Sequence, residues 1–310
     1  MDRDHLSRPL AERLLIGLAL ILAFSGLAGG AWWLWTETSV GALVRDSSPS
    51  WTPDGEVIFT SETDGKGDIY ETDRAGSRRR SLVSTSGDDG GAALSLDGSK
   101  LAYHSNVDGN YEIYAAGADG SGPSNLTHDP ATDQMPAWSR DGTQIVFMSD
   151  RGGKTFDIYR MKADGSDVER LTNGKSNWFP EYSPDGGQLA LHIERNVYIM
   201  SLSTKGLRQV TRDPDNGLHP TWSPTGHKLA FMSARNGRSE IFTSLVDGSE
   251  PHSIVTMPTG DAINPRWSPD GQYIAFVHVP GGVANDADGK AQRVVYIVEV
   301  ESGRVTRISR

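Results

Sequence analysis

Two large aromatic residues, Trp178 and Phe179, are adjacent at the end of a polar segment, residues 173–179. Such a pair can form a platform that binds a partner through apolar contact. Met135, His219 and Asn264 occupy the position of Phe179 in other copies of the repeat described below. The alternative is that these side chains only fill the interior, where large aromatics are common. The five residues are the candidate binding residues of this chain.

Catalytic chemistry has weaker support in the same segments. The titratable groups there are His128, Asp133, His219 and Asp261. They are isolated from one another in the sequence, whereas an enzyme needs several such groups around one cavity. The chain has no cysteine, which excludes thiolate catalysis and cysteine metal sites. We therefore expect no catalytic residues and no cofactor.

A metal site is also not expected. His104 and His192 fall at equivalent repeat positions, which elsewhere hold Thr60, Met148, Met232 and Val277. Because methionine and valine replace histidine there, the position favours packing over ligation, which would need further donors around it.

The balance of charge excludes one class of partner. The chain has 310 residues, with 30 basic and 40 acidic side chains and a formal net charge of −10. Nucleic-acid binding favours a clustered basic face, so nucleic acid is not expected as a partner. The 35 glycines and 16 prolines instead indicate many short strands joined by tight turns.

A repeated turn positions the candidate residues. Six related segments end in glycine, at intervals of 40 to 45 residues, and the last of them reads PRWSPDG. These segments are residues 49–55, 92–98, 136–142, 180–186, 220–226 and 265–271. Ser-Pro-Asp-Gly suits a tight turn. The aromatic residue before it can fill the wedge-shaped space between one repeat and the next, where each repeat forms one blade of the fold. The second copy has Leu94 in place of the aromatic and is the most divergent.

Each turn is followed by an apolar run, then by a third strand such as residues 157–162, and by a short outer strand such as 168–172. Nearly continuous apolar runs are typical of strands that are buried on both faces. The period fits one four-stranded blade per repeat. The expected fold is all-β: a six-bladed β-propeller of four-stranded antiparallel blades. Whether residues 42–45 also pair with the sixth blade, and so close the ring, is left open by the sequence.

The N-terminal segment predicts one transmembrane helix. Residues 14–35 carry no charge, and Trp32, Trp33 and Trp35 cluster at the far end. Twenty-two residues at about 1.5 Å each span a bilayer core of about 30 Å. A cleaved signal peptide is the alternative, but its apolar region is shorter. Because arginines precede the helix, the positive-inside rule places the N-terminus in the cytoplasm and the propeller outside. The expected domains are a tail (1–13), a signal anchor (14–35), a linker (36–46) and the propeller (47–310).

Together, the Pro-x-Trp-Ser-Pro-Asp-Gly turn, the apolar strand after it, the Ile-Tyr strand and the Leu-Thr strand resemble the repeats of the TolB family. The resemblance covers the six repeats. It implies a six-bladed propeller. Members of that family carry an additional α/β domain ahead of the propeller, and here we expect the propeller to follow the membrane helix directly, without that domain.

The expected function is a non-enzymatic binding or scaffold module, presented outside the cytoplasm to a protein, peptide or envelope polymer. The alternative is a propeller enzyme, such as a carbohydrate lyase or hydrolase, with its site at the mouth of the central channel.

Overall fold

The computed structural model describes residues 45–309, apart from residue 64 and residues 213–216 and 282–290. Every regular element in this part of the chain is a β-strand. No helix among these residues is long and apolar enough to cross a membrane. The predicted tail, the predicted transmembrane helix and all but the end of the predicted linker lie outside the described residues.

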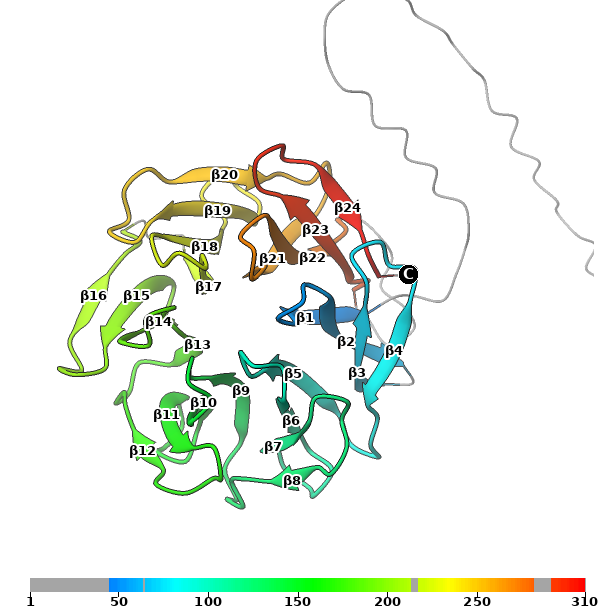
Figure 1. Ribbon diagram of the computed structural model, residues 1–310. Helices are drawn as coiled ribbons and strands as arrows, with labels where there is room; N and C mark the ends of the chain where they lie inside the picture. The colour runs from blue at the N-terminus through cyan, green and yellow to red at the C-terminus, as the bar shows by residue number, and fades with distance from the viewer. Residues whose placement is uncertain (1–44, 64, 213–216, 282–290, 310) are drawn as a thin grey trace, which may run out of the picture. The chain divides into compact units, whose positions relative to one another are not determined.

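The strands form six four-stranded sheets that surround a central axis (Figure 1). Blade one contains β1 (Asp46–Trp51), β2 (Val57–Thr63), β3 (Lys66–Thr72) and β4 (Arg79–Val83). Blade two contains β5 (Asp89–Leu94), β6 (Lys100–Ser105), β7 (Glu112–Gly117) and β8 (Ser124–Asn125). Blade three contains β9 (Asp133–Trp138), β10 (Gln144–Ser149), β11 (Asp157–Lys162) and β12 (Glu169–Arg170).

Blade four contains β13 (Asn177–Tyr182), β14 (Gln188–Ile193), β15 (Asn196–Ser201) and β16 (Leu207–Gln209). Blade five contains β17 (Leu218–Trp222), β18 (Lys228–Ser233), β19 (Glu240–Leu245) and β20 (His252–Val255). Blade six contains β21 (Asp261–Trp267), β22 (Tyr273–Val279), β23 (Val294–Glu299) and β24 (Val305–Arg307). All neighbouring strands within a blade are antiparallel and consecutive in the chain, which confirms the predicted six-bladed propeller.

The repeated turn has the expected hydrogen bonds. In blade three the Ser139 hydroxyl donates to Asp141 (2.6 Å) and accepts from the backbone N–H of Gln144 (2.9 Å). The N–H of Gly142 donates to the carbonyl of Ser139 (3.0 Å), and its φ of +67° is one that glycine adopts without strain. The turn therefore joins the innermost strand to the second strand through contacts within residues 139–144.

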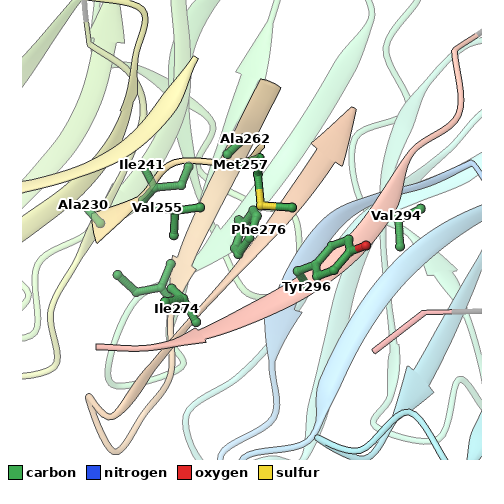
Figure 2. Packing of buried hydrophobic residues seen from close by; sticks show 10 residues of the cluster. Ala230, Ile241, Val255, Met257, Ala262, Ile274, Phe276, Val294 and Tyr296 are labelled. Atoms are coloured by element: carbon green, nitrogen blue, oxygen red, sulfur yellow. The ribbon is translucent and has the colours of Figure 1, made fainter. Parts of the chain in front are cut away.

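The buried apolar side chains form six clusters, and each cluster lies between two neighbouring blades. Figure 2 shows the cluster between blades five and six, where Ala230 and Ile241 from one blade meet Ile274 and Phe276 from the next. The second strand of each blade is buried on both faces because it packs against a blade on either side. This arrangement explains its unbroken run of apolar residues.

The repeat tryptophans also link one blade to the blade before it. The indole Nε1 of Trp138 donates to the carbonyl of Ala93 (3.1 Å), and that of Trp222 donates to the carbonyl of Glu181 (3.3 Å). Both bonds run from the innermost strand of one blade to the innermost strand of the preceding blade. The predicted role of this aromatic in the wedge between blades is confirmed.

A tryptophan at the same repeat position also links the first blade to the last. Trp51 of blade one donates to the carbonyl of Arg266 in blade six (2.9 Å). The guanidinium of Arg74 lies over the rings of Trp51 and Tyr273 and pairs with Asp270 (2.9 Å). Each blade is completed by its own consecutive strands, and the described chain adds one parallel bridge, Arg45 to Arg293, between the first and last blades. Closure therefore combines side-chain packing with a short backbone contact, in which the N–H of Asp46 donates to the carbonyl of Arg293 (3.0 Å). Residues 42–44, which the sequence left open as a further strand, lie outside the described residues.

Candidate functional site

All six innermost strands contain a bulge at the same position. The register between the first and second strands shifts there in every blade. The residues at this position all have positive φ, between +48° and +60°: Ser48, Gly91, Met135, Phe179, His219 and Asn264. A bulge bends the strand and redirects side chains. Each of the five non-glycine residues is held in a region that costs on the order of 1–3 kcal/mol.

The backbone N–H of the bulge residue finds its acceptor in the preceding blade. Met135 N donates to Nδ1 of His104 (3.4 Å), and His219 N donates to Nδ1 of His192 (3.3 Å). Phe179 N makes the equivalent contact with the sulfur of Met148 (3.2 Å). His104, Met148 and His192 share one position on the second strands of their blades. Histidine and methionine can both stand there because each offers a buried acceptor atom to the bulge N–H of the next blade.

This role requires the two histidines to be neutral. Burial lowers the pKa of His104 to about 4 and that of His192 to about 3. Because the charged form is disfavoured, Nδ1 keeps the lone pair that accepts the bulge N–H. The two residues therefore hold the bulge by hydrogen bonding, in agreement with the packing role expected from the sequence.

The predicted aromatic pair is divided between two environments. Both residues lie within β13, and not in a loop before it as the sequence suggested, because the innermost strand begins at Asn177. Trp178 packs against Phe156, with ring centres 4.8 Å apart. The ring of Phe179 packs against His219 (4.0 Å) and His192 (5.7 Å). The two aromatics therefore do not form a single platform.

His219 is the third member of this ring cluster. Its ring lies 5.3 Å from that of His192. Burial, followed by the proximity of the His192 ring and the positive charge of Arg266, lowers the pKa of His219 well below its usual range. The side chain of Asn264 opposes this shift, although His219 Nδ1 and Asn264 Oδ1 do not reach hydrogen-bond geometry. His219 is therefore a neutral imidazole behind the wall that Phe179 presents to the channel.

The channel contains a cavity of about 510 Å³ between the bulges and the repeated turns. Met135, Phe179 and Asn264 lie on its wall, whereas Trp178 and His219 do not. The next layer of the wall takes one residue from each blade: Ser50, Ala93, Ala137, Glu181, Thr221 and Arg266. Its border at the turns includes Leu96, Arg140, Pro184, Pro224 and Pro269. The cavity thus opens at the end of the channel where the repeated turns lie, which we call the turn end. The sequence had located the site at the opposite end, in the loops that connect one blade to the next.

Glu181 and Arg266 are the charged groups in the wall layer. One carboxylate oxygen of Glu181 accepts from the Thr221 hydroxyl and the Trp222 N–H, both at 3.2 Å. The other oxygen, Oε2, is buried without a hydrogen-bond partner. Burial raises the pKa of Glu181, and the charge of Arg266 opposes this shift. Arg266 donates to the carbonyl of Pro265 (3.1 Å), and among the described residues no ion pair joins it or Glu181 to an opposite charge.

Several other polar atoms of the wall are buried without a partner. They are Ser50 Oγ, Tyr182 OH, Asn264 Oδ1 and Trp267 Nε1. These atoms have almost no solvent-accessible surface, so they are buried within the wall and do not open into the cavity. The sequence analysis missed Glu181 and Arg266. Both stand two residues after the bulge residue in their strands, and the two-residue alternation of a strand was the available signal.

Asp133 and Asp261, two other titratable candidates, make their contacts away from the cavity. The carboxylate of Asp133 is buried and pairs with Arg151 (2.5 Å), and burial raises its pKa to about 6 against the effect of Ser149 and Arg151. Asp261 accepts from the backbone N–H of Ser239 (2.8 Å). Neither these two nor His128 lies on the cavity wall, and the part of the chain that the structure describes contains no cluster of three metal-ligating side chains. The structure therefore does not bring His128, Asp133, His219 and Asp261 together.

The fold and the cavity define a β-propeller with a hollow at its centre. The family described as the TolB beta propeller domain matches residues 48–192 and 174–295. This chain belongs to that family.

One relative of this chain is the Tol-Pal system protein TolB of Francisella tularensis subsp. mediasiatica (strain FSC147), which is 35% identical over 114 residues. That match covers 34% of this chain and only 26% of the relative. The TolB of subsp. tularensis (strain FSC 198) matches to the same extent.

Solved structures agree on the fold. TolB from Acinetobacter baumannii has 27% identity and a TM-score of 0.66, over 73% of this chain and 57% of that one. An oligogalacturonate lyase in complex with manganese has a TM-score of 0.58 over 84% of this chain and 76% of the lyase. Its identity of 17% shows a shared fold alone.

Proposed function

We propose that this chain is a non-enzymatic binding module, held in a membrane by residues 14–35, that presents its propeller outside the cytoplasm to a protein, peptide or envelope polymer. Membership of the TolB propeller family supports a binding role, and the names of the matched relatives support a role in the cell envelope. The matched segment spans about a quarter of those relatives, so their partners are not assigned to this chain.

The observation that carries the proposal is the central cavity. Its wall combines the charged residues Glu181 and Arg266 with the hydroxyl-bearing residues Ser50 and Thr221. Its border at the turns combines prolines with Leu96, which is 51% exposed, and the exposed Arg140. An apolar border around a polar centre is the usual composition of a recognition site.

The test is a pull-down from detergent-solubilised membranes with the full-length chain and with a chain lacking residues 1–40. We expect both chains to recover the same partner. We expect the double change Leu96→Ser and Arg140→Ala to abolish recovery, because it removes the exposed side chains at the border of the cavity. The matched control is Val168→Ser, which changes an exposed apolar side chain next to the outer strand β12.

Recovery that survives the double change would exclude the turn end of the cavity as the binding face. Failure to recover any partner with either chain would contradict a protein-binding role.

An enzyme of the carbohydrate lyase or hydrolase class is the second candidate. One observation favours it: Glu181 is a half-buried residue of the cavity wall, and partial desolvation raises the pKa of its carboxyl group, as a general acid requires. Turnover of acidic or neutral oligosaccharides by the full chain, lost in Glu181→Gln, would establish this candidate in place of the first.

A further inference from the structure

A second cavity lies between the end of the outer strand of blade four and the facing side of blade five, and it shares no residue with the central cavity. Its volume of about 460 Å³ is within the range of small-molecule sites, which is about 300–1,000 Å³. Its charged residues are Arg212, Arg235 and Asp247. Asp247 is occupied within its own turn, where it accepts from the backbone N–H (2.9 Å) and the hydroxyl (2.6 Å) of Ser249. The two arginines are therefore the charged groups that are available to a ligand.

Arg235 is held on two aromatic rings of its own blade. The carbon of its guanidinium group lies 4.5 Å from the ring centre of Phe242 and 5.8 Å from that of Phe231. Its Nε donates to the hydroxyl of Ser233 (2.9 Å). Within the part of the chain that the structure describes, no carboxylate pairs with this half-buried side chain, and its two terminal nitrogens have no hydrogen-bond partner. The rings and the serine fix the guanidinium, and its terminal nitrogens remain for a ligand.

Blade three shows what the same arginine does when carboxylates are present. Arg151 stands at the repeat position of Arg235, two residues after the end of the second strand. Its guanidinium also lies over two rings of its blade, and its Nε also donates to a serine hydroxyl, that of Ser149 (2.9 Å). Its terminal nitrogens bind the carboxylates of Asp133 (2.5 Å) and Asp129 (3.6 Å). An arginine in this setting therefore binds two carboxylates when they are available.

Blade five lacks the first of these carboxylates for a steric reason. Asp133 stands two residues before the bulge of blade three, and Gly217 holds that place in blade five. A Cβ added to Gly217 would lie 2.5 Å from the hydroxyl oxygen of Thr211 and 2.9 Å from a methyl group of Val197. The position thus has no room for a side chain. Blade five keeps the arginine and its aromatic support without the acid that neutralises them in blade three.

We propose that this cavity binds a dicarboxylate. One carboxylate of the ligand pairs with the terminal nitrogens of Arg235, in the role that Asp133 has in blade three, and the other pairs with Arg212, which is exposed in the same cavity. The planar fork of a guanidinium matches a carboxylate with two parallel hydrogen bonds. The same chemistry is offered by a small organic diacid and by neighbouring acidic side chains of a peptide.

The experiment measures binding to the full-length chain in detergent micelles by equilibrium dialysis of radiolabelled probes. The probes are glutarate, as a small diacid, and N-acetyl-aspartyl-aspartate amide, as an acidic peptide, with acetate and inorganic phosphate for comparison. We expect glutarate or the peptide to bind at least tenfold more tightly than acetate or phosphate. The tighter of the two probes identifies the source of the carboxylates as a small acid or a peptide.

Variants locate the site. Arg235→Ala removes the fixed guanidinium, so we expect at least a tenfold loss of affinity for the tighter probe. Arg235→Lys keeps the charge without the fork and should cost less, as should Arg212→Ala. The matched control is Arg304→Ala, which removes an exposed arginine that pairs with Glu299 (3.4 Å) outside this cavity and should leave the affinity unchanged. An equal loss in Arg304→Ala would show a general effect of net charge and contradict the assignment.

Binding of acetate or phosphate as tight as that of the dicarboxylates overturns the proposal, as does the absence of binding, and these comparisons need no variant to fold. The sequence also contains Asp213 and Asp215, which lie outside the described residues. If glutarate binds only to the double variant Asp213→Asn and Asp215→Asn, the chain supplies the carboxylate itself and the proposal is wrong. Because this cavity shares no residue with the central one, its failure would leave the proposed partner binding at the turn end unaffected.

Discussion

The interfaces between blades and the central cavity are built from adjacent residues of the same strands, yet the repeat is kept at the interfaces and broken at the cavity. At the interfaces, the indole groups of Trp51, Trp138 and Trp222 donate to carbonyls of the neighbouring blade. Trp267 occupies the same repeat position and packs at the interface between blades five and six, but its indole Nε1 is buried without a hydrogen-bond partner among the described residues. Three of the four tryptophans at this repeat position thus donate across an interface, whereas the positions two residues after the bulge differ from blade to blade and place Glu181 and Arg266 on the cavity wall. Function is expected where the repeat is broken.

The largest effect should come from breaking an interface. Trp222→Ala removes a buried ring and its bond to blade four, so we expect a loss of about 4 kcal/mol in the free energy of unfolding. Urea unfolding followed by near-UV circular dichroism measures it. A sharper comparison uses phenylalanine: Trp222→Phe leaves the Glu181 carbonyl without its indole donor, whereas Trp267→Phe removes no hydrogen bond. Equal costs for these two changes would show that the indole hydrogen bond between the blades contributes nothing measurable to stability.

An intermediate effect should come from acid, through the histidines that hold the bulges. The folded-state pKa values of His104 and His192 are about 4 and about 3, below the unfolded value of about 6.5. As pH falls below about 6.5 the unfolded chain binds protons that the folded chain does not, so stability is full above that pH and declines toward pH 4. We expect a loss of about 2 kcal/mol per histidine between pH 7 and pH 5, measured from urea midpoints.

The control for this pH dependence is the double variant His104→Met and His192→Met, because Met148 already supplies the acceptor in blade three. We expect its stability to vary much less between pH 7 and pH 5, with the remaining slope due to other buried groups such as His219. A variant with the slope of the unchanged chain would show that these histidines are not the groups that titrate.

The smallest effect should distinguish the closing interface from a surface contact. Arg74 stacks on Trp51 and Tyr273 and pairs with Asp270, so it joins blades one and six. We expect Arg74→Ala to lower the free energy of unfolding by about 1 kcal/mol. Arg80→Ala breaks an exposed pair with Glu71 inside blade one and should cost at most about 0.5 kcal/mol. Thermal unfolding of the two variants side by side checks this, and a larger loss for Arg80→Ala would contradict a role of Arg74 in closing the ring.

Most of the fold could be predicted from the sequence. Ser139, Asp141 and Gly142 make their turn with one another and with Gln144, so the contacts that define a turn lie within a few residues. The apolar second strands followed from the same repeat. The start of the innermost strand was less certain: β13 begins at Asn177, earlier than expected, because the strand continues through the bulge at Phe179.

The candidate site could be predicted only in part. Met135, Phe179 and Asn264 were found because they share one repeat position, and all three line the cavity. Trp178 was grouped with Phe179 by adjacency, but neighbouring residues of a strand point to opposite faces, and Trp178 packs against Phe156. Glu181 and Arg266 looked like ordinary charged residues because nothing in the sequence shows that they share a cavity.

The sequence by itself determined the number of blades, the strands within them and the turn that joins the first two strands, because these features depend on local contacts repeated six times. Only the tertiary structure decided which side chains face the channel and which end of it is hollow. It also decided that Glu181 and Arg266 meet the same cavity without pairing. Those properties depend on how separate blades are placed around the axis, and no local pattern in a single repeat encodes that placement.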